Sequence, residues 1–494
     1  MINISLSKSR LTSLLFFLLF TIAASGQETS PQTASAEAVQ KLREFTQLYF
    51  ERRGIPGLSF ALSQDGNTLF SEVRGYADIE NQVSVQTGSL FRIASISKLI
   101  TSVAVLKLVQ DGAVNLDEDI KKYLPYLNKL NGRVTLRNIL NHTSGLRGYR
   151  HGEFNSTKKY WTTKELMDYL KDDTLEYRPG TKYLYSTLAY NYAVAAIEAA
   201  TGKTFNQILK EKIFLPLQMS STHLDEQEKI LPLRARGYIK NDYRELQNAQ
   251  LADLSIKYPG GGMISTSGDL LKFGNALING SLLSSAWLDT LTKISKLSDG
   301  TPLQYGLGIS VDTDPQGRKI ISHSGGGTGF VSLLQMYPAE KLVSVHLLNI
   351  VDRNSGSPAR DLSKIFLGDS VIVPLKPTAD TLMQVYLVSG IQEALKTYSF
   401  IKQTPSLQFN PDREEFKQFG YDLIKISRIP DAIAVFNEML RDDPQNKSAY
   451  IGLGDAYSKD GNTGLAVKNY RQALRLDPAN KYVQSRLSVL EKKK

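Results

Sequence analysis

The sequence predicts an α+β fold built around one layered sheet, followed by an all-α repeat region. Near the N-terminus, two β-rich runs at 55–63 and 68–77 flank an Asp65-Gly66 turn and predict a hairpin. Three further strand candidates lie far along the chain, at 319–324, 329–337 and 342–348. Because the residues between look helical or irregular, both ends of one domain must contribute strands. This favours a layered architecture over a doubly wound one.

The first 26 residues have the features of a secretory signal. Lys8 and Arg10 precede an apolar stretch over 11–24, which ends at small residues. An N-terminal membrane anchor is the alternative, but the stretch is shorter than the roughly 20 apolar residues of a membrane-spanning helix. Without any cysteine, the chain cannot become a lipoprotein. We expect a soluble protein exported to the periplasm or outside the cell, with a flexible leader over 27–37 before a helix at 38–53.

Composition and charge exclude several classes of protein. The formal net charge of +10 is spread along the chain apart from a short cluster at 492–494, which is typical of a solvated surface. No segment resembles a nucleic-acid-binding module. A Gly-x-Ser-x-Gly elbow, a His-Glu-x-x-His pair and a phosphate loop between strand and helix are all missing from the sequence. We expect no metal, no other cofactor and no nucleic-acid partner.

The region 371–494 matches itself at an offset of 34 residues, which is the tetratricopeptide period. The matched positions are Gly420 and Gly454, Ala432 and Ala466, Phe436 and Tyr470, Leu440 and Leu474, and Asp443-Pro444 and Asp477-Pro478. The clearest repeats are 414–447 and 448–481. An ordinary pair of helical hairpins is the alternative. Such a short array either binds a protein or peptide partner or packs against the first domain.

Ser95-x-x-Lys98 is the pattern with the most specific chemistry. A serine and a lysine three residues apart share one helix face, so the lysine amine can lie against the hydroxyl and favour its deprotonation. The same spacing at Ser5, Ser156 and Ser399 falls in the signal, a polar loop and the repeats. Only Ser95 opens a long apolar helix, over 96–109, with first-turn N–H groups free to face a reacting carbonyl. An ordinary N-cap serine is the alternative.

Two further motifs support an active site around Ser95. Tyr185-Ser-Thr187 precedes a predicted helix at 188–200, where the tyrosine can face a lysine, although the chain has 24 tyrosines and simple packing is the alternative. His323-Ser-Gly325 lies between two predicted strands in the glycine-rich run 323–329. Glycines let a substrate backbone approach an edge strand, while a histidine offers a donor or an acceptor. A glycine-rich turn is the alternative for this motif.

Together and in this order, the three motifs resemble the active-site motifs of the penicillin-recognising serine hydrolases. The chain is similar to the class C β-lactamase-related branch, which includes D-aminopeptidases, D-alanyl-D-alanine carboxypeptidases and esterases. Segments 91–95, 140–146 and 259–269 resemble this branch too. The resemblance covers about 38–370. It implies a β-lactamase/transpeptidase-like fold, with a five-stranded antiparallel sheet flanked by helices and a helical region.

The resemblance also implies a role for each motif residue. Ser95 is the implied nucleophile, Lys98 and Tyr185 the implied proton shuttle, and the N–H groups of Ser95 and Gly326 the implied oxyanion hole. The implied substrate-binding residues are Thr187, His323, Ser324 and Gly325. His142, which follows a predicted helix at 135–141, is expected to be structural.

Two positions depart from the family pattern. Thr187 stands where the family commonly has Asn, whose amide can donate and accept at once, whereas Thr has a single hydroxyl. His323 stands where β-lactamases and transpeptidases commonly have Lys, and a neutral imidazole binds a carboxylate more weakly than an ammonium does. Both departures argue against efficient β-lactamase activity.

The sequence therefore favours an exported serine hydrolase that cleaves an ester or an amide through an acyl-Ser95 intermediate. A D-amino-acid or small peptide substrate fits this hypothesis. One alternative is a penicillin-binding DD-carboxypeptidase or weak β-lactamase. The other is a non-catalytic envelope scaffold that binds partners through its repeats.

Overall fold

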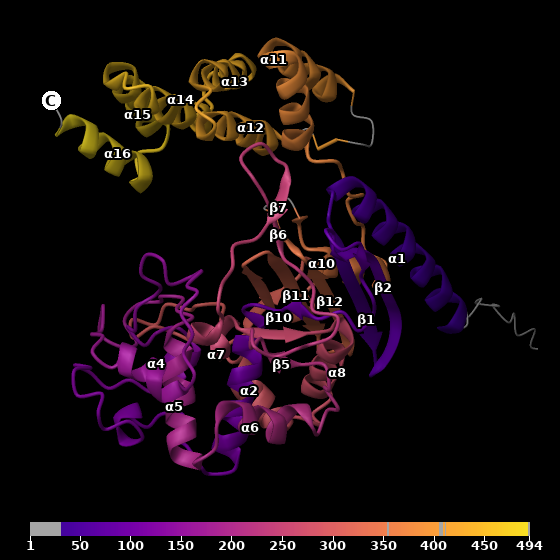
Figure 1. Cartoon of the computed structure of the whole chain (residues 1–494), viewed down its shortest axis with the longest axis vertical. Coiled ribbons are helices and arrows are strands. Elements are labelled where there is room, and N and C mark those ends of the chain that lie inside the picture. Colours follow the sequence, from indigo (N-terminus) through magenta and orange to yellow (C-terminus); the bar gives the residue numbers. More distant parts are fainter. Residues whose placement is uncertain (1–30, 353–354, 405–408, 411, 493–494) are drawn as a thin grey trace, which may run out of the picture.

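A central antiparallel sheet joins segments from both ends of the first domain (Figure 1). The computed structural model describes residues 31–352, 355–404, 409–410 and 412–492. The strands run in the order β3-β2-β1-β12-β11-β10-β9. Their bounds are β1 Gly57–Gln64, β2 Asn67–Asp78, β3 Val83–Ser84, β9 Ser310–Thr313, β10 Lys319–Gly327, β11 Phe330–Tyr337 and β12 Leu342–Leu348. The predicted hairpin and all three distant strands are confirmed.

The expectation of five strands is wrong, because the sheet has seven. Both additional strands are at the edges: β3 is two residues long and β9 is four. Strands this short hold too few residues to show the alternation by which a strand is recognised in sequence. Near the centre of the sheet, β1 and β12 are antiparallel neighbours, and Leu58 of β1 lies opposite Leu348 of β12.

The two faces of the sheet are covered by different helices. Leu58, Phe60 and Leu62 of β1 pack into one apolar cluster with α1 (Pro31–Arg53) and α10 (Pro358–Phe366). Ala61 faces the other way, into the main core beneath α2 (Ile96–Gln110) and α8 (Ser267–Ile278). Strand β1 is buried on both faces, and its two serines on the second face, Ser59 and Ser63, form hydrogen bonds with Ser267 and Asn275 of α8. Helix α1 begins at Pro31, seven residues before the expected start at 38.

The long segment between β3 and β9 forms a helical region and all strands of two small sheets except β13, which follows β12. The small sheets are β4-β8-β5, from Phe91–Arg92, Met263–Ser265 and His223–Leu224, and β13-β6-β7, from Ile350–Val351, Tyr238–Lys240 and Leu246–Asn248. The α-helices are α3 Leu136–Leu140, α4 Thr163–Leu170, α5 Ala189–Thr201, α6 Phe205–Leu209, α7 Tyr258–Gly261 and α9 Ser285–Thr292. Short helical turns are 120–122, 210–214 and 255–257. The expected helices at 96–109, 135–141 and 188–200 correspond to α2, α3 and α5.

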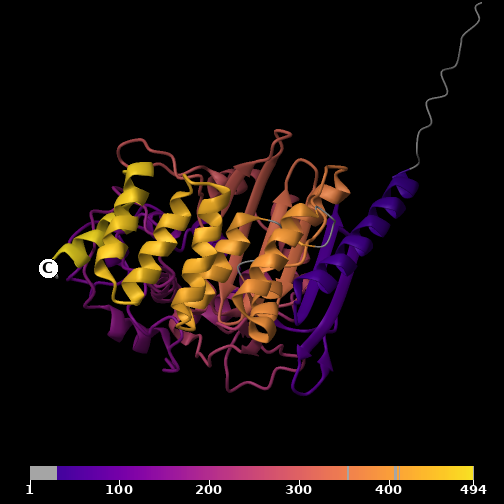
Figure 2. The same ribbon diagram turned by 90° about the horizontal axis from the view of Figure 1, so that it is seen from above.

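The chain after α10 is all-helical over its described residues. Its helices are α11 Thr378–Gln403, α12 Arg413–Lys425, α13 Ile429–Asp442, α14 Lys447–Lys459, α15 Thr463–Leu476 and α16 Lys481–Glu491. Figure 2 shows them side by side in a row. Residues matched at the offset of 34 make the same contact twice, since Gly420 packs on the ring of Phe436 and Gly454 on that of Tyr470. The repeat is therefore visible in packing, while its tetratricopeptide identity stays a prediction.

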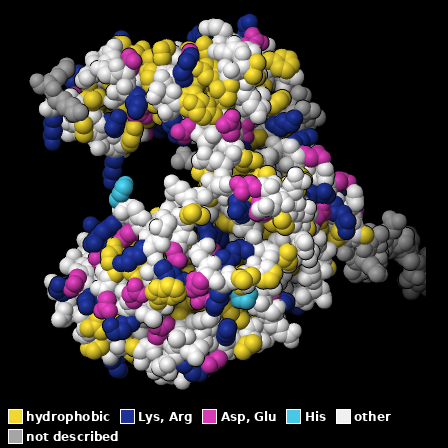
Figure 3. All heavy atoms as spheres, in the orientation of Figure 1, with side chains coloured by type: hydrophobic (Ala, Val, Ile, Leu, Met, Phe, Trp, Pro, Cys, Tyr) yellow, Lys and Arg dark blue, Asp and Glu magenta, His cyan; other side chains and the backbone are white. Residues whose placement is uncertain are grey.

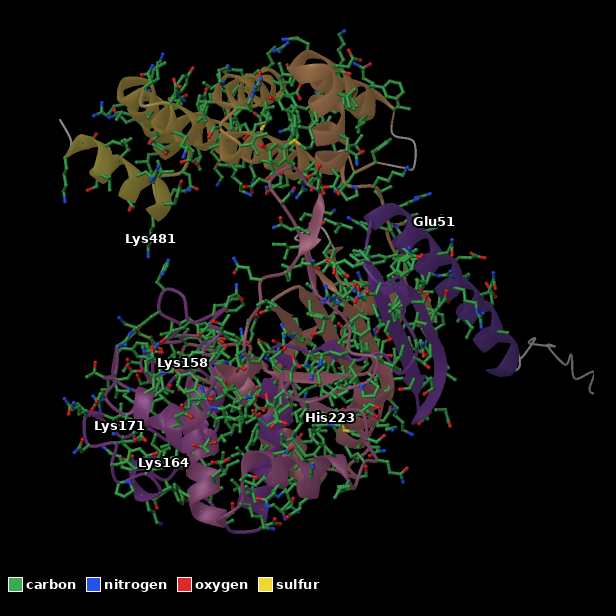
Figure 4. The ribbon with its side chains drawn as sticks, in the orientation of Figure 1. Glu51, Lys158, Lys164, Lys171, His223 and Lys481 are labelled. Carbon is green, nitrogen blue, oxygen red and sulfur yellow. The ribbon has the colours of Figure 1, made fainter. Side chains whose placement is uncertain are left out.

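The helical region overhangs the sheet domain and touches it at one end. The β6–β7 hairpin reaches up to α11 and α12 (Figure 1), where Lys240 and Arg244 form ion pairs with Asp380. At the other end an open gap separates the two parts (Figure 3). Lys481, at the start of α16, extends toward this gap (Figure 4). The expected signal at 1–26 lies outside the described residues, within which no helix is long and apolar enough to cross a membrane.

Candidate active site

Ser95 lies at the start of α2, directly after a strained residue. Ala94 has φ of 44°, in the left-handed region that a residue with a Cβ seldom adopts, and Ser95 follows in helical geometry. The Ser95 hydroxyl makes no capping bond to the helix backbone. It accepts a hydrogen bond from Lys98 Nζ at 3.0 Å instead. The N-cap alternative for this serine therefore does not describe its hydroxyl, which is directed to the lysine.

Lys98 is fully buried, at 0% exposure, and its ammonium donates three hydrogen bonds. The acceptors are Ser95 Oγ at 3.0 Å, Thr187 Oγ1 at 3.0 Å and the carbonyl oxygen of Gly260 at 2.6 Å. Among the described residues, no carboxylate lies within ion-pairing distance of it. Burial, and then the positive charge of Lys257, hold the pKa of Lys98 well below its usual range. The neutral amine that can accept a proton is thus available at a much lower pH than in a free lysine.

Tyr185 stands over this pair at the mouth of the site, with 40% of its surface exposed. Lys98 Nζ lies 4.6 Å from its ring centroid, and its hydroxyl forms a hydrogen bond with the Ser95 side chain. Burial outweighs that hydrogen bond and raises the pKa of Tyr185 to about 12. The phenol therefore keeps its proton near neutral pH, and Lys98 is the better placed base of the two.

His142 supports Tyr185 from below. The two ring centroids are 4.3 Å apart, and His142 Nδ1 accepts a hydrogen bond from the Ser186 N–H at 3.1 Å. Burial lowers the pKa of His142 well below its usual range, so the ring is neutral. Tyr183, Tyr190 and Tyr305 pack around it. This histidine orders the loop that carries Tyr185.

The third motif lies on β10, beside Ser95. A Cβ on Gly325 would lie 2.2 Å from the Ile93 carbonyl oxygen, so only glycine lets the strand approach the turn before α2 this closely. Ser324 is exposed, whereas His323 is 4% exposed. The two ring nitrogens of His323 lie 3.0 Å from the Tyr305 hydroxyl and 2.7 Å from the Ser324 carbonyl oxygen. In this arrangement His323 braces the strand instead of offering a nitrogen to a substrate.

Ser95 opens onto a narrow pocket of about 30 Å³. Thr187 and Gly326 also line it, so the sequence motifs meet at one place. No described acceptor takes the Ser95 backbone N–H, which stays free to bind an oxyanion. Within the described residues no cluster of side chains could hold a metal ion.

Sequence reasoning missed several residues that complete the site. Gly260 supplies the third acceptor for Lys98, and a Cβ on it would meet Thr187 Cγ2 at 2.7 Å. Tyr149 forms a hydrogen bond with Thr187 and lines the pocket with Phe154 and Lys257. The glycine run at 260–262 was a signal in the sequence that could have pointed to Gly260. The others come from loops that carry no readable pattern.

Comparison with known proteins agrees with this geometry. The family model described as Beta-lactamase matches residues 36–367. The chain belongs to the beta-lactamase family. The motif residues Ser95, Lys98 and Tyr185 all lie inside the matched range.

Individual members of the family are similar over different lengths. The human serine beta-lactamase-like protein LACTB, mitochondrial, is 30% identical, and the match covers 51% of this chain and 60% of that protein. The chain therefore spans less than two thirds of that relative. Penicillin-binding protein 4* of Bacillus subtilis is 27% identical, with 68% of this chain and 79% of that protein covered. The D-amino acid amidase structure from Ochrobactrum anthropi matches with a TM-score of 0.57 and 26% identity, over 68% of this chain and 97% of that one.

Proposed function

We propose that this chain is an exported serine hydrolase that cleaves an ester or an amide through an acyl-Ser95 intermediate. The observation that carries the proposal is the hydrogen bond from buried Lys98 to Ser95, combined with a lowered pKa of that lysine. A neutral amine held against a hydroxyl is the arrangement that activates a serine.

The reaction follows from the positions of these groups. Lys98 accepts the Ser95 proton as Oγ attacks the carbonyl carbon, and the N–H groups of Ser95 and Gly326 bind the oxyanion. The bond to the leaving alcohol or amine then breaks, and this group takes the proton through the Tyr185 hydroxyl. A water molecule attacks acyl-Ser95 by the reverse route, which releases a carboxylic acid and restores the serine.

The proposal extends to the placement of the protein and its domains. A signal at 1–26 would export it to the periplasm or outside the cell. The hydrolase domain would end near residue 370, and the tetratricopeptide-like domain 371–494 would offer a surface to a protein or peptide partner. The packing that recurs at the offset of 34 supports this second domain.

A second candidate function is that of a penicillin-binding DD-carboxypeptidase or weak β-lactamase. The similarity to penicillin-binding protein 4* favours it. The third motif argues against this function. Its first residue is His323 and not a lysine that could pair with a substrate carboxylate, and both ring nitrogens of His323 already contact Tyr305 and Ser324. Labelling by a fluorescent penicillin, prevented in the Ser95→Ala variant, would establish this candidate.

The main test is labelling of Ser95 by a fluorophosphonate probe, together with hydrolysis of p-nitrophenyl esters. We expect wild type to be labelled and active, and Ser95→Ala to lose both. Ser102→Ala, on the same helix but outside the pocket, is the matched control. Continued labelling or turnover by Ser95→Ala would contradict the proposal and favour the scaffold alternative.

A further inference from the structure

One residue that lines the pocket beside Ser95 is a buried lysine, Lys257, which has no role in the proposed reaction. Lys257 is 4% exposed. Its ammonium donates to the Phe154 carbonyl oxygen at 2.5 Å and lies 4.1 Å from the Phe154 ring centroid. Among the described residues, no carboxylate lies within 4.0 Å of it. A buried charge without a counter-ion is costly, so a bound anion would stabilise it.

Positive charge continues outward from this point. Arg92 lines both the narrow pocket and a wider one of about 660 Å³, which adds Arg234 and Arg236. Arg92 and Arg234 share Asp225, with N–O distances of 2.7 and 3.6 Å, so two guanidinium groups have one carboxylate between them. The Nε of Arg234 is buried without a hydrogen-bond partner. Asp253 also lines the wider pocket, and Arg236 is paired with Asp78 and Glu80. The excess of positive charge is therefore confined to Lys257 and the two arginines that share Asp225.

This pocket lies on the acyl side of the scissile bond. Tyr185 is the group placed to protonate the leaving group, and it is outside the residues that line the pocket. Ser95 and Gly326, which would hold the carbonyl, do line it. The part of the substrate that stays on the serine must therefore extend along Lys257.

We propose that Lys257, with Arg92 behind it, recognises a carboxylate on the acyl part of the substrate. The inference rests on the proposed function and narrows its substrate class to esters or amides of acidic acyl groups. A hydrogen bond from an ammonium to a carboxylate is stronger than one to the neutral Phe154 carbonyl. The same charge repels a free α-ammonium, so D-amino-acid amides with an unblocked amine should be poor substrates.

Three esters with one leaving group test this specificity. They are p-nitrophenyl butyrate, mono-p-nitrophenyl glutarate and p-nitrophenyl 4-aminobutyrate, with Ser95→Ala giving the uncatalysed background. We expect kcat/KM in the order anionic, neutral, cationic. In Lys257→Met the anionic-to-neutral ratio should fall about tenfold or more, because a charged hydrogen bond is lost. Lys164→Met also removes one positive charge, but from an exposed side chain of α4, and this control variant should keep the wild-type ratio.

The pH dependence of that ratio separates recognition from a structural role. Burial, and then Arg92, lower the pKa of Lys257 to about 8. The charged or titratable groups around it are Arg92 on β4, Lys98 on α2 and Tyr149 in the loop before α4. The ammonium is present below this pKa and lost above it. The anionic-to-neutral ratio should thus fall as pH rises through about 8 in wild type, and stay flat in Lys257→Met.

The other possible results overturn either the role of Lys257 alone or the proposed function as a whole. An equal loss on all three esters in Lys257→Met, with Ser95 still labelled by the phosphonate, would show that Lys257 only holds the Phe154 loop and would overturn the inference alone. A wild-type preference for the neutral or cationic ester would overturn it too. If wild type neither turns over any ester nor reacts with the probe, the proposed function fails and the inference fails with it.

Discussion

At the scale of single residues, the surroundings of the Lys98 amine set its pKa and so its ability to accept a proton from Ser95. Lys98 is enclosed by α2, by the loop of Thr187 and by the Gly260 turn, all of which offer neutral oxygen acceptors. A carboxylate at any of these places would keep the ammonium charged and the serine unreactive. The lowered pKa of Lys98 is therefore a property of three separate chain segments.

Replacing Lys98 tests this directly. Lys98→Met preserves the buried volume and removes the base, so kcat/KM on a neutral ester should fall by a factor of about 10² to 10⁴. Lys107→Met, in the last turn of the same helix, is the matched control and should retain wild-type rates. A Lys98→Met enzyme with more than about a tenth of the wild-type kcat/KM would contradict the assignment of the base.

The pH profile is a second readout of Lys98. The reaction needs the neutral amine, so kcat/KM should rise with pH through the pKa of Lys98 and reach its plateau well below pH 10.5, since that pKa is lowered. Tyr185→Phe should reduce the plateau without moving this rise, because a phenol with a pKa of about 12 stays protonated throughout. Steady-state rates between pH 5 and 9 measure both. A rate that has reached no plateau by pH 9 would mean that Lys98 is not desolvated.

At the scale of elements, close helix packing depends on glycines that meet the aromatic rings of a neighbouring helix. A Cβ on Gly454 of α14 would lie 2.5 Å from the Tyr470 ring of α15, and Gly420 of α12 meets Phe436 of α13 in the same way. The helices can approach only where no side chain separates them. This explains why glycine recurs at the offset of 34 residues.

Gly454→Ala should therefore destabilise the helix pair α14–α15 by about 1–3 kcal/mol through overpacking, which exceeds the gain of about 1 kcal/mol in helix propensity. Gly464→Ala in α15 is the matched control, because its nearest neighbour would be 3.8 Å away. Hydrogen–deuterium exchange of 447–476 should show faster exchange in the first variant only. Equal protection in both variants would mean that the two helices do not pack as closely as described.

At the scale of the whole molecule, the β6–β7 hairpin joins the two parts. Arg244, only 11% exposed, contacts Asp380 of α11 at 2.9 Å and Asp422 of α12 at 3.5 Å. Lys240 contacts Asp352 and Asp380. Gly237 and Asn248, at the base of this hairpin, line the wider pocket near the active site. The position of the helical region is thus tied to a wall of the wider pocket.

Arg244→Ala should loosen this junction. Removing one partner of a buried ion pair typically costs about 3–5 kcal/mol, since it leaves buried carboxylates short of positive charge. Lys447→Ala removes a more exposed pair with Asp477 inside the helical region and should have little effect. Small-angle scattering should show a larger radius of gyration for Arg244→Ala only. An unchanged radius would mean that apolar contacts hold the two parts together.

Much of the fold was predictable because its signals are local. The hairpin β1–β2, the strands β10 to β12 and helix α2 each show a pattern within one short segment. The edge strands β3 and β9 were not predicted, because two to four residues are too few to show the alternation of apolar and polar residues that marks a strand. For the same reason Ser95, Lys98 and Tyr185 could be named from short motifs, and structure brings them together as expected.

What the sequence determined by itself is the set of proposed reacting groups and the repeat, since both depend on residue types at fixed spacing along the chain. Tertiary structure alone decided their state and surroundings. Only folding brings the Gly260 carbonyl to Lys98 and the Tyr305 hydroxyl to His323. Folding also places Lys257 beside Ser95, where no carboxylate of the described part of the chain pairs with it. The physical reason is that pKa and specificity depend on burial and on neighbours from distant segments, and no spacing along the chain encodes those distances.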